Sequence, residues 1–312
     1  TENPTFKKVV WQVREDVEKG SALSDALAKH PKAFPHFFAS MVRSGETGGN
    51  LSEVLDHLAD YLEKDRDLNR NIRSAFTYPK FILILMGFLI VILFYKVFPV
   101  LADFYDQAPD DVKIPHATKM LMAFSSFVAD HWTAIVVSVL FLVISFVVFK
   151  NHSATKPMYD RLVFKLPLVG PVNRRLSITR SVRTLGSMLR CGVPLLTSLE
   201  NTRNLTNNEE IGKDLERVME SVETGGTISS PLRLSHSFPP ISVYMISVGE
   251  HSGRLPELLE GCADALDKEI DHLIKQLLIA LEPALIILIA ILVAFMAIAL
   301  YLPVFSSLTS VQ

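Results

Sequence analysis

The sequence predicts an all-α membrane protein in which two duplicated cytoplasmic helical-bundle modules are joined to three transmembrane helices. Three observations predict this class. A stretch of 21 residues occurs twice, three long apolar runs interrupt the chain, and apolar residues between the runs recur at helical spacing.

The repeated stretch covers residues 45–65 and 249–269, a constant offset of 204 with 10 of 21 positions identical. Both copies carry the motif Gly-Glu-x-x-Gly-x-Leu. Its residues are Gly45, Glu46, Gly49 and Leu51 in the first copy and Gly249, Glu250, Gly253 and Leu255 in the second. The same offset pairs Phe34-Pro35 with Phe238-Pro239, and Pro79 with Pro283. We therefore interpret the chain as an internal duplication in which a helical module leads through a proline into an apolar run.

Three apolar runs account for much of the hydrophobic fraction of 49%. Residues 81–98 contain one charge, Lys96, and residues 133–149 and 284–302 contain none. At about 1.5 Å per residue, each helix would be roughly 25 to 30 Å long, enough to cross a bilayer core. The runs predict transmembrane helices at 79–99, 133–149 and 283–302.

The basic residues predict the orientation of the chain. Segment 1–78 has 11 Lys and Arg and segment 150–282 has 16, whereas the loop 100–132 has two. Because positively charged segments stay in the cytoplasm, both modules should be cytoplasmic. The loop and the tail 303–312 should lie on the other side, with the N-terminus inside the cytoplasm.

In the first module, Phe6, Val10, Val13 and Val17 predict one amphipathic helix that ends near Gly20. A short helical turn at 23–27 and a short helix at 37–43 should follow. The glycines at 45–49 predict a turn, and from Leu51 a long helix should run to residue 78 and enter the membrane at Pro79. The second module should repeat this order, with helices at 209–224 and from Leu255.

The second module also contains a predicted helical hairpin that the first lacks. Its helices carry Val182, Leu185 and Leu189 before Gly192, and Leu195, Leu196 and Leu199 after Pro194. A counterpart would precede Thr1, so we expect the first module to be incomplete at its N-terminus. We then expect uncovered apolar surface on its faces, formed by Phe6, Val10, Val13, Leu55 and Leu62.

The sequence offers little support for an enzyme. We find no HExxH, GxSxG or Walker sequence, and no strand precedes the glycines at 45–49, so these glycines predict a structural turn and not a phosphate loop. The two cysteines, Cys191 and Cys262, lack zinc-site spacing. We predict no catalytic residue, metal or cofactor. A net charge of −2 gives no bias toward nucleic acid.

The alternative interpretation is a membrane transporter or channel subunit. Glu282 is the one acid beside an apolar run, and its position near a helix start favours an interfacial carboxylate over an ion-coupling group. The two copies enter the membrane from the same side, and the middles of the runs carry no charge. Both features argue against a transport pathway of the inverted-repeat kind.

The sequence resembles the inner-membrane platform proteins of type II secretion systems and type IV pilus machines, the GspF/PilC group. The resemblance rests on both Gly-Glu-x-x-Gly-x-Leu motifs, the Phe-Pro pairs, Leu166-Pro167 with Gly170, the Gly192-Val193-Pro194-Leu195-Leu196 hairpin, and Glu282-Pro283. It implies a non-enzymatic protein of the bacterial inner membrane, with a periplasmic loop and tail.

The resemblance also implies partners. These are a hexameric cytoplasmic ATPase, pilin or pseudopilin subunits, other inner-membrane machine components, membrane lipid, and further copies of the chain in a homodimer or higher oligomer. Coupling of the ATPase to insertion or extraction of the subunits is the implied role. Secretion, pilus extension and DNA uptake are equally compatible with it.

Overall fold

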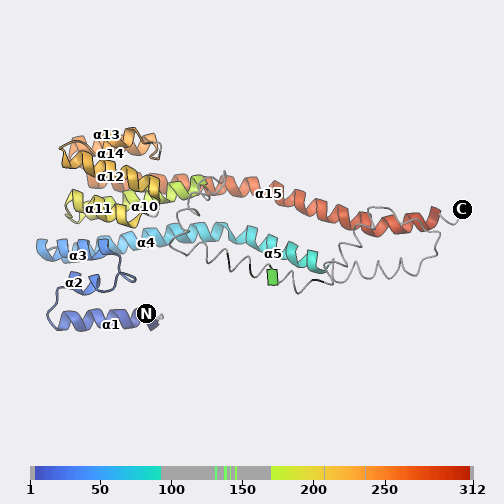
Figure 1. Ribbon diagram of the computed structural model, residues 1–312, viewed down its shortest axis with the longest axis horizontal. Helices are drawn as coiled ribbons and strands as arrows, with labels where there is room; N and C mark the ends of the chain where they lie inside the picture. The colour runs from blue at the N-terminus through green and yellow to red at the C-terminus, as the bar shows by residue number, and fades with distance from the viewer. Residues whose placement is uncertain are drawn as a thin grey trace. The chain divides into compact units, whose positions relative to one another are not determined.

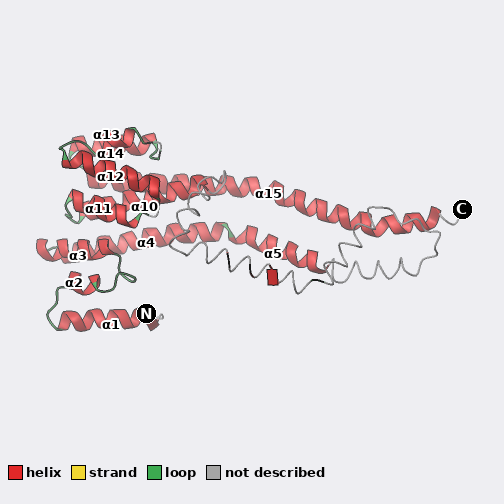
Figure 2. Cartoon of the chain, in the orientation of Figure 1, coloured by secondary structure: helices red, strands yellow, loops and turns green. Residues whose placement is uncertain are grey.

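The computed structural model describes residues 4–92, 131, 137–138, 141, 145, 170–206, 208–235 and 237–309. All regular secondary structure in these residues is helical (Figure 2), as the apolar spacing predicted. In chain order (Figure 1) the helices are α1 (Pro4–Glu18), α2 (Leu23–Ala28), α3 (His36–Gly48), α4 (Leu51–Ala75), α5 (Thr77–Ile92), α10 (Gly170–Arg190), α11 (Leu195–Leu205), α12 (Glu209–Glu223), α13 (Ser229–Arg233), α14 (Pro240–Ser252) and α15 (Leu255–Thr309).

The chain divides into two compact units. One comprises Thr1–Ile72 and Asp160–Ile274, and the other comprises Arg73–Tyr159 and Lys275–Gln312. We call the first the helical unit. Its described residues form repeat 1, residues 4–72, and repeat 2, residues 170–274. Most of the two predicted modules, 1–78 and 150–282, therefore belongs to one compact body.

Among the described residues, two helical stretches are long and apolar enough to cross a membrane, Leu51–Ile92 and Leu255–Ile291. They contain most of the first predicted span and the start of the last. Pro79 lies in the first turn of α5, where its missing N–H costs nothing, whereas Pro283 lies inside the continuous α15. The predicted span 133–149 and the loop 100–132 lie almost wholly outside the described residues.

Among the residues that the structure describes, three apolar cores hold the helical unit together. The largest lies entirely within repeat 2 and joins α10 and α11 to α12 through α15. A small core lies entirely within repeat 1, around Val13, Ala26, Leu27 and Val42. The third is shared. In it, Phe37, Phe38, Met41, Val54 and Leu58 of repeat 1 pack with Met188, Cys191 and Val193 of repeat 2.

The predicted hairpin is formed by α10 and α11, with Gly192 at φ +76° in the turn between them. One face of this hairpin packs in the core of repeat 2, and the residues at its tip pack in the core that repeat 2 shares with repeat 1. Repeat 1 has no such hairpin among its described residues, and Val10, Leu55 and Leu62 are exposed as expected. The expectation is wrong for Val13, which α2 and α3 bury in the small core, and Phe6 is only partly exposed, with its ring 5.8 Å from that of Phe34.

Candidate functional site

The repeated glycines occupy two different environments. Gly49 and Gly253 end α3 and α14 in the left-handed conformation, at φ 75° and 70°, and each donates its N–H to the carbonyl four residues earlier. Glycine adopts this conformation without the steric penalty of a Cβ. The prediction of a turn at 45–49 is therefore wrong for residues 45–48, because α3 continues through Gly48 and the chain turns only at Gly49.

Gly45 and Gly249 instead lie within the last turns of α3 and α14, where the following helix approaches closely. A Cβ at Gly45 would lie 2.9 Å from Cγ2 of Val54, and a Cβ at Gly249 would lie 3.0 Å from Cα of Leu255. Both glycines are buried. They are needed for this contact between helices and not for backbone freedom.

The glutamates of the motif connect α3 to the short helix α2 in repeat 1 and α14 to the short helix α13 in repeat 2. Glu46 accepts hydrogen bonds from the N–H of Leu23 at 2.6 Å and from the hydroxyl of Ser24 at 2.6 Å, at the start of α2. Glu250 accepts them from the N–H of Ile228 and from that of Ser229 at 3.0 Å, at the start of α13. A carboxylate is favoured there because the first N–H groups of a helix lack intrahelical partners.

The sequence analysis missed Ser24 and Ser229, although they occupy equivalent positions in the two copies, at an offset of 205, one more than the offset of the motifs. Leu51 and Leu255 begin α4 and α15 and pack against the cores of repeat 1 and repeat 2. Glu282 lies in α15, in the second compact unit. The motif residues thus act within each repeat and do not converge on one pocket.

Polar contacts join the two repeats along a surface that we call the inter-repeat junction. Ser44 donates to the carbonyl of Cys191 at 2.7 Å, and the hydroxyls of Tyr61 and Thr184 lie 3.1 Å apart. Further contacts are Lys64 to Asp264 at 2.8 Å, Arg180 to Asp65 at 3.1 Å, Arg180 to Asn69 at 2.8 Å, and Asn201 to Ser40 at 3.3 Å. The junction therefore combines a small shared apolar core with hydrogen bonds and ion pairs around it.

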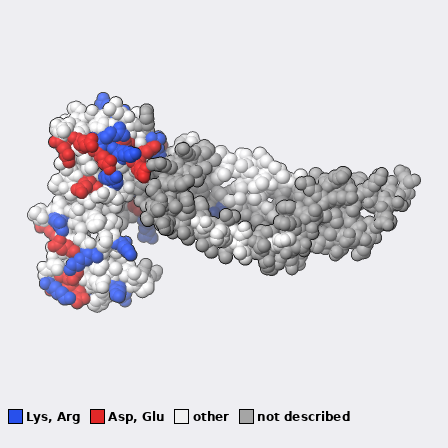
Figure 3. Space-filling view, in the orientation of Figure 1, with Lys and Arg blue, Asp and Glu red and all other residues white. Residues whose placement is uncertain are grey.

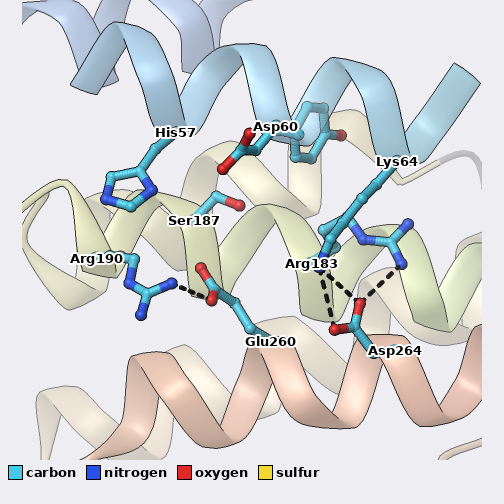
Figure 4. A pocket seen from close by; sticks show the side chains of 9 residues that line it. His57, Asp60, Lys64, Arg183, Ser187, Arg190, Glu260 and Asp264 are labelled. Carbon is cyan, nitrogen blue, oxygen red and sulfur yellow. Dashed lines mark hydrogen bonds and ion pairs between the residues drawn. The ribbon is translucent and has the colours of Figure 1, made fainter. Parts of the chain in front are cut away.

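Cavities lie along this junction. One of about 130 Å³ lies between α4, α10 and α15 and is lined by His57, Asp60, Tyr61, Lys64, Arg183, Ser187, Arg190, Glu260 and Asp264 (Figure 4). In it, Arg190 pairs with Glu260 and Lys64 pairs with Asp264. A pocket of about 480 Å³ is lined by residues of α3 and of the α10–α11 hairpin. Another, of about 390 Å³, is lined by the segment before α3 and by residues of α3, α4 and the hairpin. With cations and carboxylates in balance, the small cavity has no marked preference for an ion of either sign.

Arg183 is the most buried charge at the junction, with 3% of its side chain exposed. It donates to Asp267 from Nη2 and lies 3.9 Å from Asp264, but its Nε and Nη1 have no hydrogen-bond partner. Burial raises the pKa of Asp267, and the neighbouring Arg183 opposes that rise. Burying a guanidinium with unpaired donors costs free energy.

Burial also affects the other titratable groups here. It raises the pKa of the Tyr61 hydroxyl, and it raises the pKa of the Cys191 thiol to about 11. Cys262, in the core of repeat 2, also has a raised pKa because of burial. A thiol with a raised pKa is a poor nucleophile at neutral pH, so neither cysteine has the environment of a catalytic one.

The described residues contain no group of three or more His, Cys, Asp and Glu side chains that could hold a metal ion. On the face shown in Figure 3, Lys and Arg are interspersed with Asp and Glu over the helical unit. This pattern gives that face no extended patch of one sign. The described residues therefore form an interface between the two repeats and hydrogen bonds that hold the helices of each repeat together.

Comparison with known proteins assigns the family. The family model described as "Type II secretion system (T2SS), protein F" matches residues 1–99 and 181–303, more than half of the chain. A type IV pilus assembly protein PilC from Myxococcus xanthus is 32% identical over 311 residues, covering 100% of this chain and 74% of that protein.

Two further relatives agree. A type IV pilus assembly protein PilC from Thermus thermophilus is 32% identical, covering 98% of this chain and 75% of its own length. A type II secretion system protein F from Xanthomonas campestris is also 32% identical, covering 90% of this chain and 69% of its own length. The chain therefore belongs to the family of type II secretion system protein F, which includes the PilC proteins of type IV pilus assembly.

Proposed function

We propose that this chain is an inner-membrane assembly platform of a type IV pilus or type II secretion machine. In this role it couples a cytoplasmic hexameric ATPase to the insertion or extraction of pilin or pseudopilin subunits. The observation that carries the proposal is the family membership, since relatives named for both machines match along nearly the whole chain. Two membrane-length helices attached to a helical unit support it.

The duplication is part of the proposal. The two family matches end at residues 99 and 303, which differ by 204, the offset of the sequence repeat. The equivalent glutamates also make equivalent bonds, Glu46 to α2 and Glu250 to α13. These observations support two copies of one module, each leading into a membrane helix, with the return span at 133–149.

Affinity purification from native membranes tests the function. A tagged chain should copurify with a hexameric ATPase and pilin-like subunits, as a homodimer or higher oligomer. Solute or ion flux through vesicles that contain the purified chain alone would favour a transporter or channel instead. Copurification without such flux would support the function as an assembly platform.

Cysteine labelling tests the orientation. Ser125→Cys should react with an impermeant thiol reagent from outside intact spheroplasts, whereas Ser52→Cys should react only after the membrane is opened. The physical reason is the 11 and 16 basic residues in the segments 1–78 and 150–282. The reverse labelling pattern would contradict the proposed topology.

A further inference from the structure

We propose that the inter-repeat junction opens as a unit, so that repeat 1 separates from the α10–α11 hairpin while repeat 2 stays folded. In the closed state the hairpin tip covers the apolar side chains of α3 and α4. In the open state that surface becomes accessible. This conformational change is a property of the helical unit itself and does not depend on the proposed function.

The distribution of buried apolar side chains is the first argument. The core of repeat 2 contains 16 buried residues, none of which belongs to repeat 1. The shared core contains 8, and only Met188, Cys191 and Val193 come from repeat 2. Contacts within a chain separate more readily where the shared apolar area is small, because less hydrophobic burial is lost on opening. Opening therefore costs far less than unfolding repeat 2.

The exposure of the polar contacts is the second argument. Lys64 and Asp264 are each about half exposed, and so is Arg180, which contacts Asp65. Ion pairs in contact with solvent contribute only about 0.2 to 1 kcal/mol each, since water competes for both partners. These contacts orient the repeats without locking them together.

The packing of the junction is the third argument. Pockets of about 130, 390 and 480 Å³ that open to the solvent lie along it, so water already reaches the edges of the surface that the two repeats share. Arg183, which lines the smallest of these pockets, pairs with Asp264 and Asp267 of α15, so these ion pairs lie within repeat 2 and do not hold repeat 1.

Two native cysteines make the proposal testable in the unmodified chain. Cys191 lies in the shared core at the junction, and Cys262 lies in the core of repeat 2. Both are buried, so each reacts only when its surroundings open. In the purified full chain in detergent micelles, N-ethylmaleimide should label Cys191 at least about tenfold faster than Cys262, a difference of about 1.4 kcal/mol in opening free energy.

Variants of junction residues that lie far from Cys191 test whether the whole inter-repeat junction opens in a single step. Arg180→Gln removes the contacts to Asp65 and Asn69, and Lys64→Gln removes the pair with Asp264. Each should raise the labelling rate of Cys191 roughly two- to fivefold and leave that of Cys262 unchanged. The control Lys19→Gln breaks an exposed pair with Glu15 at the C-terminal end of α1 and should change neither rate.

Two outcomes would overturn the proposal. Equal labelling rates for both cysteines would mean that Cys191 is exposed only by global unfolding. If Cys191 is labelled fast but Arg180→Gln and Lys64→Gln do not change its labelling rate, only the turn between α10 and α11 frays.

Discussion

Repeat 1 and repeat 2 carry the same sequence pattern and bury it to different extents. Leu55 and Leu62 of α4 are 41% and 48% exposed, whereas the equivalent residues of α15, Leu259 and Leu266, are 0% and 1% exposed. The α10–α11 hairpin accounts for the difference, because it covers α15 with its full face and repeat 1 mainly with its tip. Equivalent residues of the two repeats should therefore contribute different amounts to the free energy of unfolding.

Separate expression of the repeats should give the largest contrast. Residues 170–274 contain a complete core and should melt cooperatively as a fragment. Residues 1–78 lose the hairpin tip and leave Val10, Leu55 and Leu62 exposed, so they should be loosely folded or associate. Thermal unfolding followed by circular dichroism, with sedimentation for the oligomeric state, measures both. Equal cooperativity in the two fragments would contradict the contrast.

Truncation of equivalent leucines should show the same asymmetry inside the full chain. Leu259→Ala removes a fully buried side chain and should destabilise the helical unit by about 2 to 5 kcal/mol. Leu55→Ala, at the equivalent exposed position, should cost less than about 1 kcal/mol. Denaturant unfolding of the two variants in the same detergent compares them. Similar losses would show that α4 is covered in solution.

Alkaline pH should weaken the shared core. The Cys191 pKa is raised to about 11 from an ordinary value of 9.0, so its contribution to stability is complete below pH 9 and is lost as the pH rises toward 11. This contribution is on the order of a few kcal/mol at most. Cys191→Ala should remove this part of the pH dependence, which a comparison of both proteins between pH 8 and 11 would measure. Cys262→Ala serves as the control for the core of repeat 2.

The glycines of the motif should separate into two kinds. Gly45→Ala and Gly249→Ala place a methyl group against the next helix and should cost about 1 to 3 kcal/mol, more for Gly249, whose neighbour is backbone. Gly49→Ala and Gly253→Ala are strained by positive φ and should cost about 1 kcal/mol. Thermal shifts of the four variants rank them. ATP binding that Gly49→Ala abolished without a change in stability would instead indicate a phosphate site.

The smallest expected effect concerns the glutamates. Glu46→Gln keeps an acceptor for α2 but removes the charge, and should cost about 0.5 to 1 kcal/mol. Glu250→Gln should cost somewhat more, because Ile228 at the start of α13 is almost fully buried. Glu63→Gln, an exposed acid in the middle of α4, is the matched control and should be nearly neutral. Equal thermal shifts for all three would show that the charge at the helix starts is unimportant.

Several of these features follow from local sequence alone. The helices were predictable from apolar spacing, and the positions of Gly49 and Gly253 at helix ends from the repeated glycine clusters. The apolar runs predicted the two membrane-length helices, because length and composition suffice for that inference. The motif identified the repeat, since identical residues at a constant offset need no structure to be recognised.

The tertiary structure decided what the repeated residues do. Gly45 was expected in a turn but lies in a helix, because its requirement comes from Val54 across the helix pair and not from its own backbone. Glu46 and Glu250 reach helices more than 20 residues away, a distance that no local pattern encodes. The docking of repeat 1 on the α10–α11 hairpin depends on contacts such as Ser44 to Cys191, 147 residues apart, and only folding brings such residues together.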